Sequence, residues 1–204
     1  MNLLINSKHP RLQRFFLLSA VFHFCLLLTA CSSDWVSQAV AIVGVLEPAV
    51  MAALSILAAF GLGLSPDVLT KIQAWAQQIQ SDLTNVIKPL IDQYNQAAAD
   101  AKPGLLAEIQ TALQVVQTNM SNILAAAHVA DPAKQAKINA ILGAIQAEIT
   151  ALVNLVPVLQ GKVTDTHEQI KAVHALKSAE KFKHDFNNLV HQEFGDVKSD
   201  QLIP

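Results

Sequence analysis

Residues 131–157 read DPAKQAKINAILGAIQAEITALVNLVP, and this segment carries the clearest helical pattern in the chain. Its apolar residues recur every three or four positions, which is the period of an amphipathic helix. Asp131 is a good N-cap, and Pro132 suits the first helical position. Pro157 and Gly161 are expected to close the helix. The predicted buried stripe is Ile138, Ile141, Ile145, Ile149, Leu152 and Val156.

Two earlier segments share the pattern of this one. Each of the three segments begins with a proline, at Pro66, Pro103 or Pro132. Five residues after the proline comes a charged residue, which is followed by Ile and then by Gln or Asn. Further along each segment an apolar residue is followed by Gln, and a second block then consists of a polar residue, an apolar residue and Thr or Ser. The spacing of these positions is identical in all three copies. The blocks are Lys71-Ile72-Gln73, Glu108-Ile109-Gln110 and Lys137-Ile138-Asn139, then Asp82-Leu83-Thr84, Asn119-Met120-Ser121 and Glu148-Ile149-Thr150. Duplication of one helical unit explains the pattern, and so does convergence of three capped helices of narrow composition.

The rest of the chain also predicts helices. We expect the first over 35–62 and a second that begins at the N-cap Ser65 and kinks near Lys88, because Pro89 lies inside it. A third follows Pro103, and a single fifth helix is expected over 165–194, closed by Gly195. Short connections make successive helices antiparallel neighbours. The sequence therefore predicts an all-α, elongated up-and-down bundle of about five helices over 35–195. Coiled-coil packing between the three repeated helices is one possible arrangement. The polar tail at 196–204 is expected to be flexible.

The N-terminal segment has the features of a secretory signal. Three basic residues precede an almost wholly apolar stretch at 15–28, which is too short and wrongly flanked for a stable membrane span. It ends in Leu28-Thr29-Ala30-Cys31, which resembles the lipobox of bacterial lipoproteins. The resemblance covers residues 1–31 and implies that signal peptidase II cuts before Cys31, that its thiol carries a diacylglyceryl group, and that in many species the new amine is also acylated, commonly with palmitate. It assigns 1–30 to the signal peptide and 31–34 to the anchor segment.

Removal of that signal changes the composition of the chain. Cys25 and both arginines leave with it, and the remaining cysteine, Cys31, is the lipidated one. With 11 Lys against 16 Asp and Glu, residues 31–204 carry a formal charge of −5. A mildly acidic chain without arginine argues against a nucleic-acid partner, since basic clusters supply most of that affinity.

The predicted first helix is the most informative segment after the anchor. It has nearly the length and composition of a membrane span and begins about four residues after Cys31. One interpretation makes it the apolar central helix of the bundle, and the other places it in the bilayer, where Glu47 would cost about 2.5–3.5 kcal/mol at the centre and Pro48 would weaken a continuous span. Trp35 is expected in the interfacial belt. Trp35, Glu47 and Pro48 are the candidate membrane-proximal residues.

Catalytic and metal-binding patterns find no support in the sequence, so we predict no enzyme, no cofactor and no metal. The histidine pairs of 167–191 stand seven residues apart, about 10.5 Å of helical rise, which is too far for one zinc ion. The chain holds no phosphate loop, nucleophile elbow or zinc-protease motif. The lysines between Lys171 and Lys183 alternate with acidic residues and are read as a mixed-charge exposed face rather than a headgroup site.

These observations predict an envelope lipoprotein that acts as a non-enzymatic structural or interaction module. Its expected partners are the membrane, through the lipid, and an envelope protein or a second copy. Ser32 after the cysteine resembles the pattern for the outer membrane in a two-membrane cell. Two alternatives stay open: a membrane-active protein of the pore-forming or exclusion type whose 35–64 helix inserts, and a carrier of an apolar ligand.

Overall fold

The computed structural model describes the chain at residues 10–59 and 63–204, with side chains from Trp35 onward. It divides into two compact units, residues 1–37 and 38–204. The signal-peptide residues before Pro10, the Cys31 side chain and the predicted end of the first helix at 60–62 lie outside the described part.

The described residues are helical and contain no strand, which confirms the predicted all-α class. The first unit holds the beginning of α1, and the second holds the remainder of α1 and all later elements. In order, the elements are α1 (Pro10–Ala59), α2 (Pro66–Asp82), the π-helix η1 (Leu83–Ile87), α3 (Lys88–Gln96), α4 (Lys102–Ala126), α5 (Pro132–Leu159), α6 (Thr166–Ala175), α7 (Ala179–Phe194) and the 3-10 helix η2 (Ser199–Gln201).

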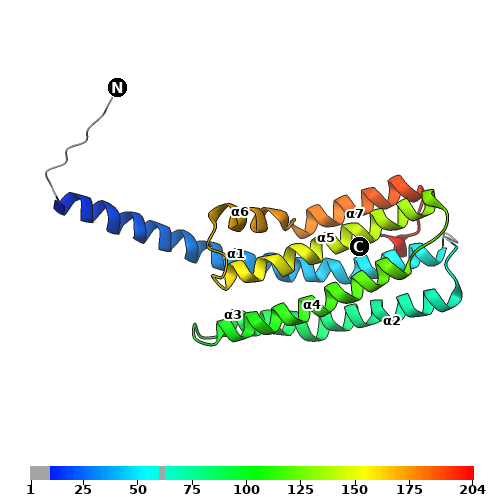
Figure 1. Cartoon of the computed structure of the whole chain (residues 1–204), viewed down its shortest axis with the longest axis horizontal. Coiled ribbons are helices and arrows are strands. Elements are labelled where there is room, and N and C mark those ends of the chain that lie inside the picture. Colours follow the sequence, from blue (N-terminus) through cyan, green and yellow to red (C-terminus); the bar gives the residue numbers. More distant parts are fainter. Residues whose placement is uncertain (1–9, 60–62) are drawn as a thin grey trace, which may run out of the picture. The chain divides into compact units, whose positions relative to one another are not determined.

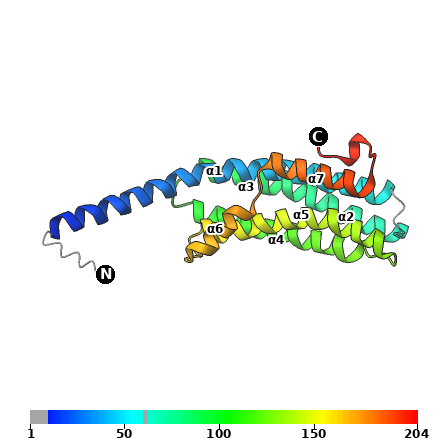
Figure 2. The ribbon, with the colours of Figure 1, turned by 90° about the horizontal axis from the view of Figure 1, so that it is seen from above.

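Within the second unit the long helices run alongside one another as a bundle (Figure 1). The view turned by 90° shows the same side-by-side arrangement (Figure 2). Helix α4 packs on both α2 and α5, while α6 and α7 pack on α5. The three repeated helices are therefore α2, α4 and α5, with α4 in the middle.

The repeated positions form the core between these helices. Each copy buries its three aligned apolar residues to 2% exposure or less. They are Ile72, Ile79 and Leu83 on α2 and η1; Ile109, Val116 and Met120 on α4; and Ile138, Ile145 and Ile149 on α5. Equal burial at equal spacing gives the three helices quasi-equivalent inner faces, while their origin by duplication stays a prediction.

The predicted helix starts are confirmed by their hydrogen bonds. The Ser65 hydroxyl accepts a hydrogen bond from the Val68 N–H at 3.3 Å, and the Asp131 carboxylate accepts one from the Ala133 N–H at 2.9 Å. Each side chain satisfies an N–H that has no acceptor within its own helix. These caps fix where α2 and α5 begin.

The irregularity expected near Lys88 is a π-helical turn. Pro89 has no N–H to donate and its ring would clash with the carbonyl four residues earlier. The turn before Pro89 is π-helical and so holds one more residue than an α-helical turn. The Lys88 N–H therefore donates to the carbonyl of Leu83, five residues earlier. The helix thus continues into α3 without a break.

The prediction of one helix over 165–194 was wrong. The chain forms α6 and α7, separated at Leu176–Ser178, where Leu176 and Ser178 adopt extended backbone angles. The Ser178 hydroxyl caps α7 by accepting from the Lys181 N–H at 3.2 Å. At the start of α6 the N-cap is Asp165, whose carboxylate accepts hydrogen bonds from the His167 and Glu168 N–H groups.

The C-terminal tail, expected to be flexible, has defined contacts in the structure. The Ile203 N–H donates to the Asn187 side-chain oxygen at 2.9 Å, and the Asn187 amide donates back to the Ile203 carbonyl at 3.0 Å. The Ser55 hydroxyl donates to Asp200 at 2.9 Å, and Ile203 is only 3% exposed. One buried apolar residue and three hydrogen bonds therefore hold a mostly polar tail against the helices of the second unit.

Candidate functional site

The predicted membrane-proximal residues fall in different units. Trp35 belongs to the first unit and is 8% exposed, whereas Glu47 and Pro48 lie in the second unit and are half-buried. The Cys31 side chain is outside the described part. Their membrane-proximal role therefore stays a prediction.

Glu47 is engaged within the bundle. Its carboxylate accepts a hydrogen bond from the Gln80 amide at 2.8 Å and another from the Thr84 hydroxyl at 2.9 Å. Both donors lie on the neighbouring helix, in α2 and η1. A carboxylate within an apolar helix is costly unless polar groups satisfy it, and Gln80 and Thr84 supply two donors. This is the geometry that the interpretation of a central bundle helix requires.

Among the residues that the structure describes, two helical segments are long and apolar enough to cross a membrane by length and composition alone. They are Trp35–Ala59, with mean hydropathy 2.2, and Pro132–Leu159, with mean hydropathy 1.6. The second is α5, whose apolar stripe forms the core described above. Core helices pass the same test of composition, so hydropathy by itself does not separate core from membrane here.

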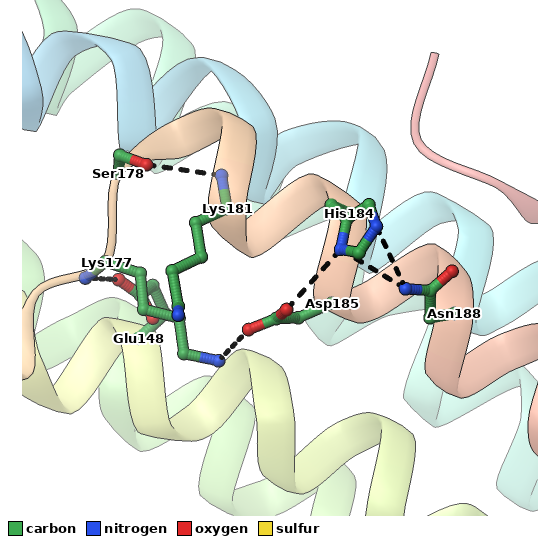
Figure 3. Close-up of polar contacts among 7 residues, drawn as sticks. All are labelled: Glu148, Lys177, Ser178, Lys181, His184, Asp185 and Asn188. Atoms are coloured by element: carbon green, nitrogen blue, oxygen red, sulfur yellow. Dashed lines mark hydrogen bonds and ion pairs between the residues drawn. The ribbon is translucent and has the colours of Figure 1, made fainter.

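The most elaborate polar cluster joins α5 to the break between α6 and α7, and Figure 3 shows its members. Glu148 on α5 is 2% exposed, and its Oε1 accepts a hydrogen bond from the Lys177 N–H at 2.8 Å. That N–H lies in the non-helical linker, so it has no acceptor within a helix. The buried carboxylate supplies the acceptor and thereby holds the linker against α5.

The side chain of Lys177 extends the cluster toward the surface. Its Nζ lies 2.8 Å from an Asp185 carboxylate oxygen on α7. His184 lies 3.7 Å from the other Asp185 oxygen and contacts the Asn188 amide at 3.2 Å (Figure 3). Lys177 and Asp185 side chains are both 40% exposed, so this outer pair is solvent-screened and contributes little by itself.

The two carboxylates have opposite electrostatic settings. Burial raises the pKa of Glu148, although the Lys177 N–H and charge act against that shift. The hydrogen bond from Lys177 lowers the pKa of Asp185. Charge is therefore disfavoured at the inner carboxylate and favoured at the outer one.

Sequence reasoning missed this cluster. Glu148 occupies the repeat position held by Asp82 and Asn119 in the other copies, and the repeat by itself assigned no role to that position. One feature of the sequence could have indicated the cluster: Glu148 is an acidic residue between Ile145 and Ile149, which belong to the predicted buried stripe. Its role is structural in the geometry seen, since its hydrogen bond goes to backbone.

Metal binding has no candidate among residues 35–59 and 63–204, where no three His, Cys, Asp or Glu side chains gather around one point. Comparison with known protein families, curated proteins and solved structures found no match for this chain.

Proposed function

We propose that the protein is a bacterial envelope lipoprotein, anchored through Cys31, whose helical bundle is a non-enzymatic interaction or structural module. The observation that carries the proposal is the motif Leu28-Thr29-Ala30-Cys31 directly after a basic segment and an apolar stretch at 15–28. A lipid on Cys31 would leave only the spacer 32–34 before Trp35, and so would keep the bundle close to the bilayer. Ser32 favours the periplasmic side of the outer membrane where the cell has two membranes.

The bundle supports the non-enzymatic part of this proposal. Its buried carboxylate, Glu148, is committed to a backbone N–H. Large apolar side chains are also exposed at Met51, Val86, Val115, Ile170 and Val173, and two of them, Val86 and Val115, line one open groove, which favours an interaction surface there.

The anchor is tested by labelling cells with an alkyne fatty acid and by mass spectrometry of the purified protein. We expect label on the wild-type chain and on Cys25→Ser, with a mature N-terminus at Cys31 and a mass increase matching a diacylglyceryl group. Cys31→Ser should lose the label. A free Cys31 thiol, or a mature chain that starts elsewhere, would contradict the proposal. Cys25→Ser is the matched control because Cys25 lies within the predicted signal.

A second candidate function is membrane insertion of the α1 segment, which the hydropathy of Trp35–Ala59 favours. Glu47→Leu separates the two. An inserting helix would gain from losing a charge that costs about 2.5–3.5 kcal/mol at the bilayer centre, and dye release from liposomes would rise. A bundle helix would instead leave the Gln80 and Thr84 donors without their acceptor, so the thermal midpoint would fall and dye release would stay at background.

A further inference from the structure

Helix α6 presents its two large aliphatic side chains to solvent. Ile170 and Val173 are each 52% exposed, more than the other large exposed apolar residues of the described chain. No residue of α6 is buried, although α6 packs on α5. Residues three apart share one side of a helix. Ile170 and Val173 therefore form a small apolar patch that the bundle leaves uncovered.

Amphipathic side chains border this patch. His167 stands three residues before Ile170 and His174 four residues after it, so both lie on the same side of α6, and both are exposed. A histidine ring joins an apolar body to a polar tip, which suits a boundary between lipid and water. The charged residues Glu168 and Lys171 pair with each other at 3.8 Å. The patch thus offers apolar contact with amphipathic edges and no excess of positive charge.

The place of α6 in the bundle indicates what covers the patch. Figures 1 and 2 both show α6 at the end of the second unit that also holds the loop between α3 and α4. In Figure 1, α1 and α4 both run away from this end. The second unit begins on α1 at Gln38, so Gln38 and α6 belong to the same end of the bundle.

The proposed anchor joins the chain close to this end. Cys31 precedes Gln38 by seven residues, which span about 10.5 Å as a helix and at most about 25 Å when fully extended. A lipid on Cys31 would therefore hold this end of the second unit within that distance of a bilayer. The bilayer is an apolar phase within reach of a surface helix that hides neither of its aliphatic residues.

We infer that α6 rests on the bilayer surface, with Ile170 and Val173 in the interfacial layer, and so fixes which side of the bundle faces the membrane. The inference rests on the proposed anchoring through Cys31. The lipid supplies the attachment, so two aliphatic side chains need only orient a bundle that is already held at the surface. Buried Glu148 holds the Lys177 N–H just after α6, which keeps this end of the helix in place against α5.

Site-specific photo-cross-linking of the full chain in cells tests this contact. A benzophenone amino acid replaces Val173, and the phospholipids of the cells are labelled with radioactive phosphate. After irradiation we expect phosphorus label on the chain. A diacylglyceryl group on Cys31 contains no phosphorus, so this label reports the contact of α6 with phospholipid and not the anchor.

Two positions are matched controls for the probe. Ala175 is also exposed on α6, but it lies two residues from Val173 and so about 160° around the helix. Val115 is 45% exposed on α4, in the groove between α4 and the helix formed by η1 and α3. Both positions should give background phospholipid label, because one faces away from the patch and the other belongs to a different surface.

A change at Ile170 then tests the apolar contact itself. With the probe at Val173, Ile170→Ser should lower the phospholipid label by about tenfold, because it removes one of the two aliphatic side chains from the interface. Ile170→Leu should keep the label. Ile170 is exposed in the bundle, and circular dichroism of both variants checks that they fold.

Each outcome decides the inference. Phospholipid label from Val173 alone, lowered in Ile170→Ser, supports it. Equal label from Ala175 or Val115, unchanged label in Ile170→Ser, background from all positions, or an adduct of Val173 with protein only would overturn it. Fatty-acid label on Cys31 is read on the same samples. Fatty-acid label without a phospholipid adduct overturns this inference and leaves the anchor intact, whereas a phospholipid adduct at Val173 without fatty-acid label contradicts the anchor alone.

Discussion

Replacing Glu148 with glutamine should change the pH dependence of stability in a defined direction. Burial raises the pKa of Glu148 above its ordinary value of 4.5. Between the ordinary pKa of unfolded Glu148 and its raised pKa in the folded chain, the folded chain holds a proton that the unfolded chain releases. The free energy of unfolding therefore falls, through Glu148, as the pH rises across that interval. The energetic cost of ionising this buried carboxyl is absent below the pKa of the unfolded chain and fully present above the pKa of the folded chain. Each unit of pKa difference corresponds to about 1.4 kcal/mol.

Glutamine keeps an acceptor for the Lys177 N–H and carries no charge to desolvate. The free energy of unfolding of Glu148→Gln minus that of the wild type should therefore increase as the pH rises above the ordinary pKa of 4.5, and it should level once the pH exceeds the raised pKa of folded Glu148. Taking the difference also removes most of the opposite contribution of Asp185, whose lowered pKa gives stability that is lost as pH falls. Urea denaturation followed by circular dichroism across this pH range measures it.

A second variant isolates the hydrogen bond. Glu148→Met has similar volume but no acceptor, so it should be less stable than Glu148→Gln by about 1–3 kcal/mol, the cost of leaving the Lys177 N–H unsatisfied. Amide exchange of Lys177 should accelerate in the Met variant alone. Glu180→Gln, exposed in the first turn of α7, is the control. A pH-independent difference for Glu148→Gln would refute the burial argument, and equal stability and exchange for Gln and Met would refute the role of the hydrogen bond.

Three further stability predictions concern the last helix and its neighbour. Phe186→Ala should cost about 3–5 kcal/mol, because Phe186 is 1% exposed in the core; a loss below 1 kcal/mol in urea denaturation would contradict its packing. Ser178→Ala should cost about 1 kcal/mol through loss of the α7 cap, and Ser178→Asp should recover it; equal midpoints for the two would argue against capping. Gly195→Ala should cost about 1–3 kcal/mol because Gly195 has φ +72° and ψ −135°, a region that only glycine adopts readily. Gly143→Ala, inside α5 with open space around its Cβ position, should instead raise stability by about 1 kcal/mol, so a fall in both variants by calorimetry would refute the backbone argument.

The parts of the fold that were predicted correctly depend on short-range chemistry. Ser65 and Asp131 were recognisable as caps because each accepts from an N–H two or three residues later. Pro89 disturbs its own helix whatever surrounds it, although the sequence did not show that a π-turn, rather than a kink, would absorb the disturbance.

The errors and omissions concern contacts between distant residues. An uninterrupted helix over 165–194 was reasonable locally, but the linker N–H at Lys177 is satisfied by Glu148, 29 residues away. The tail at 196–204 is polar in composition, yet Asp200 meets Ser55 across 145 residues. Helical periodicity carries no information about such pairs.

Three features could be read directly along the chain: its helical character, the first residues of several helices, and the resemblance of its N-terminal segment to a lipoprotein signal that ends at Cys31. These features arise from neighbours within about one helical turn or one motif, so they can be read along the chain. Only the tertiary structure decided that Glu148 would be buried, that α6 would turn Ile170 and Val173 outward, and that α4 would share a groove with η1 and α3. Burial and charge at those positions depend on which helix faces which, and that is set by packing of the whole core rather than by local sequence.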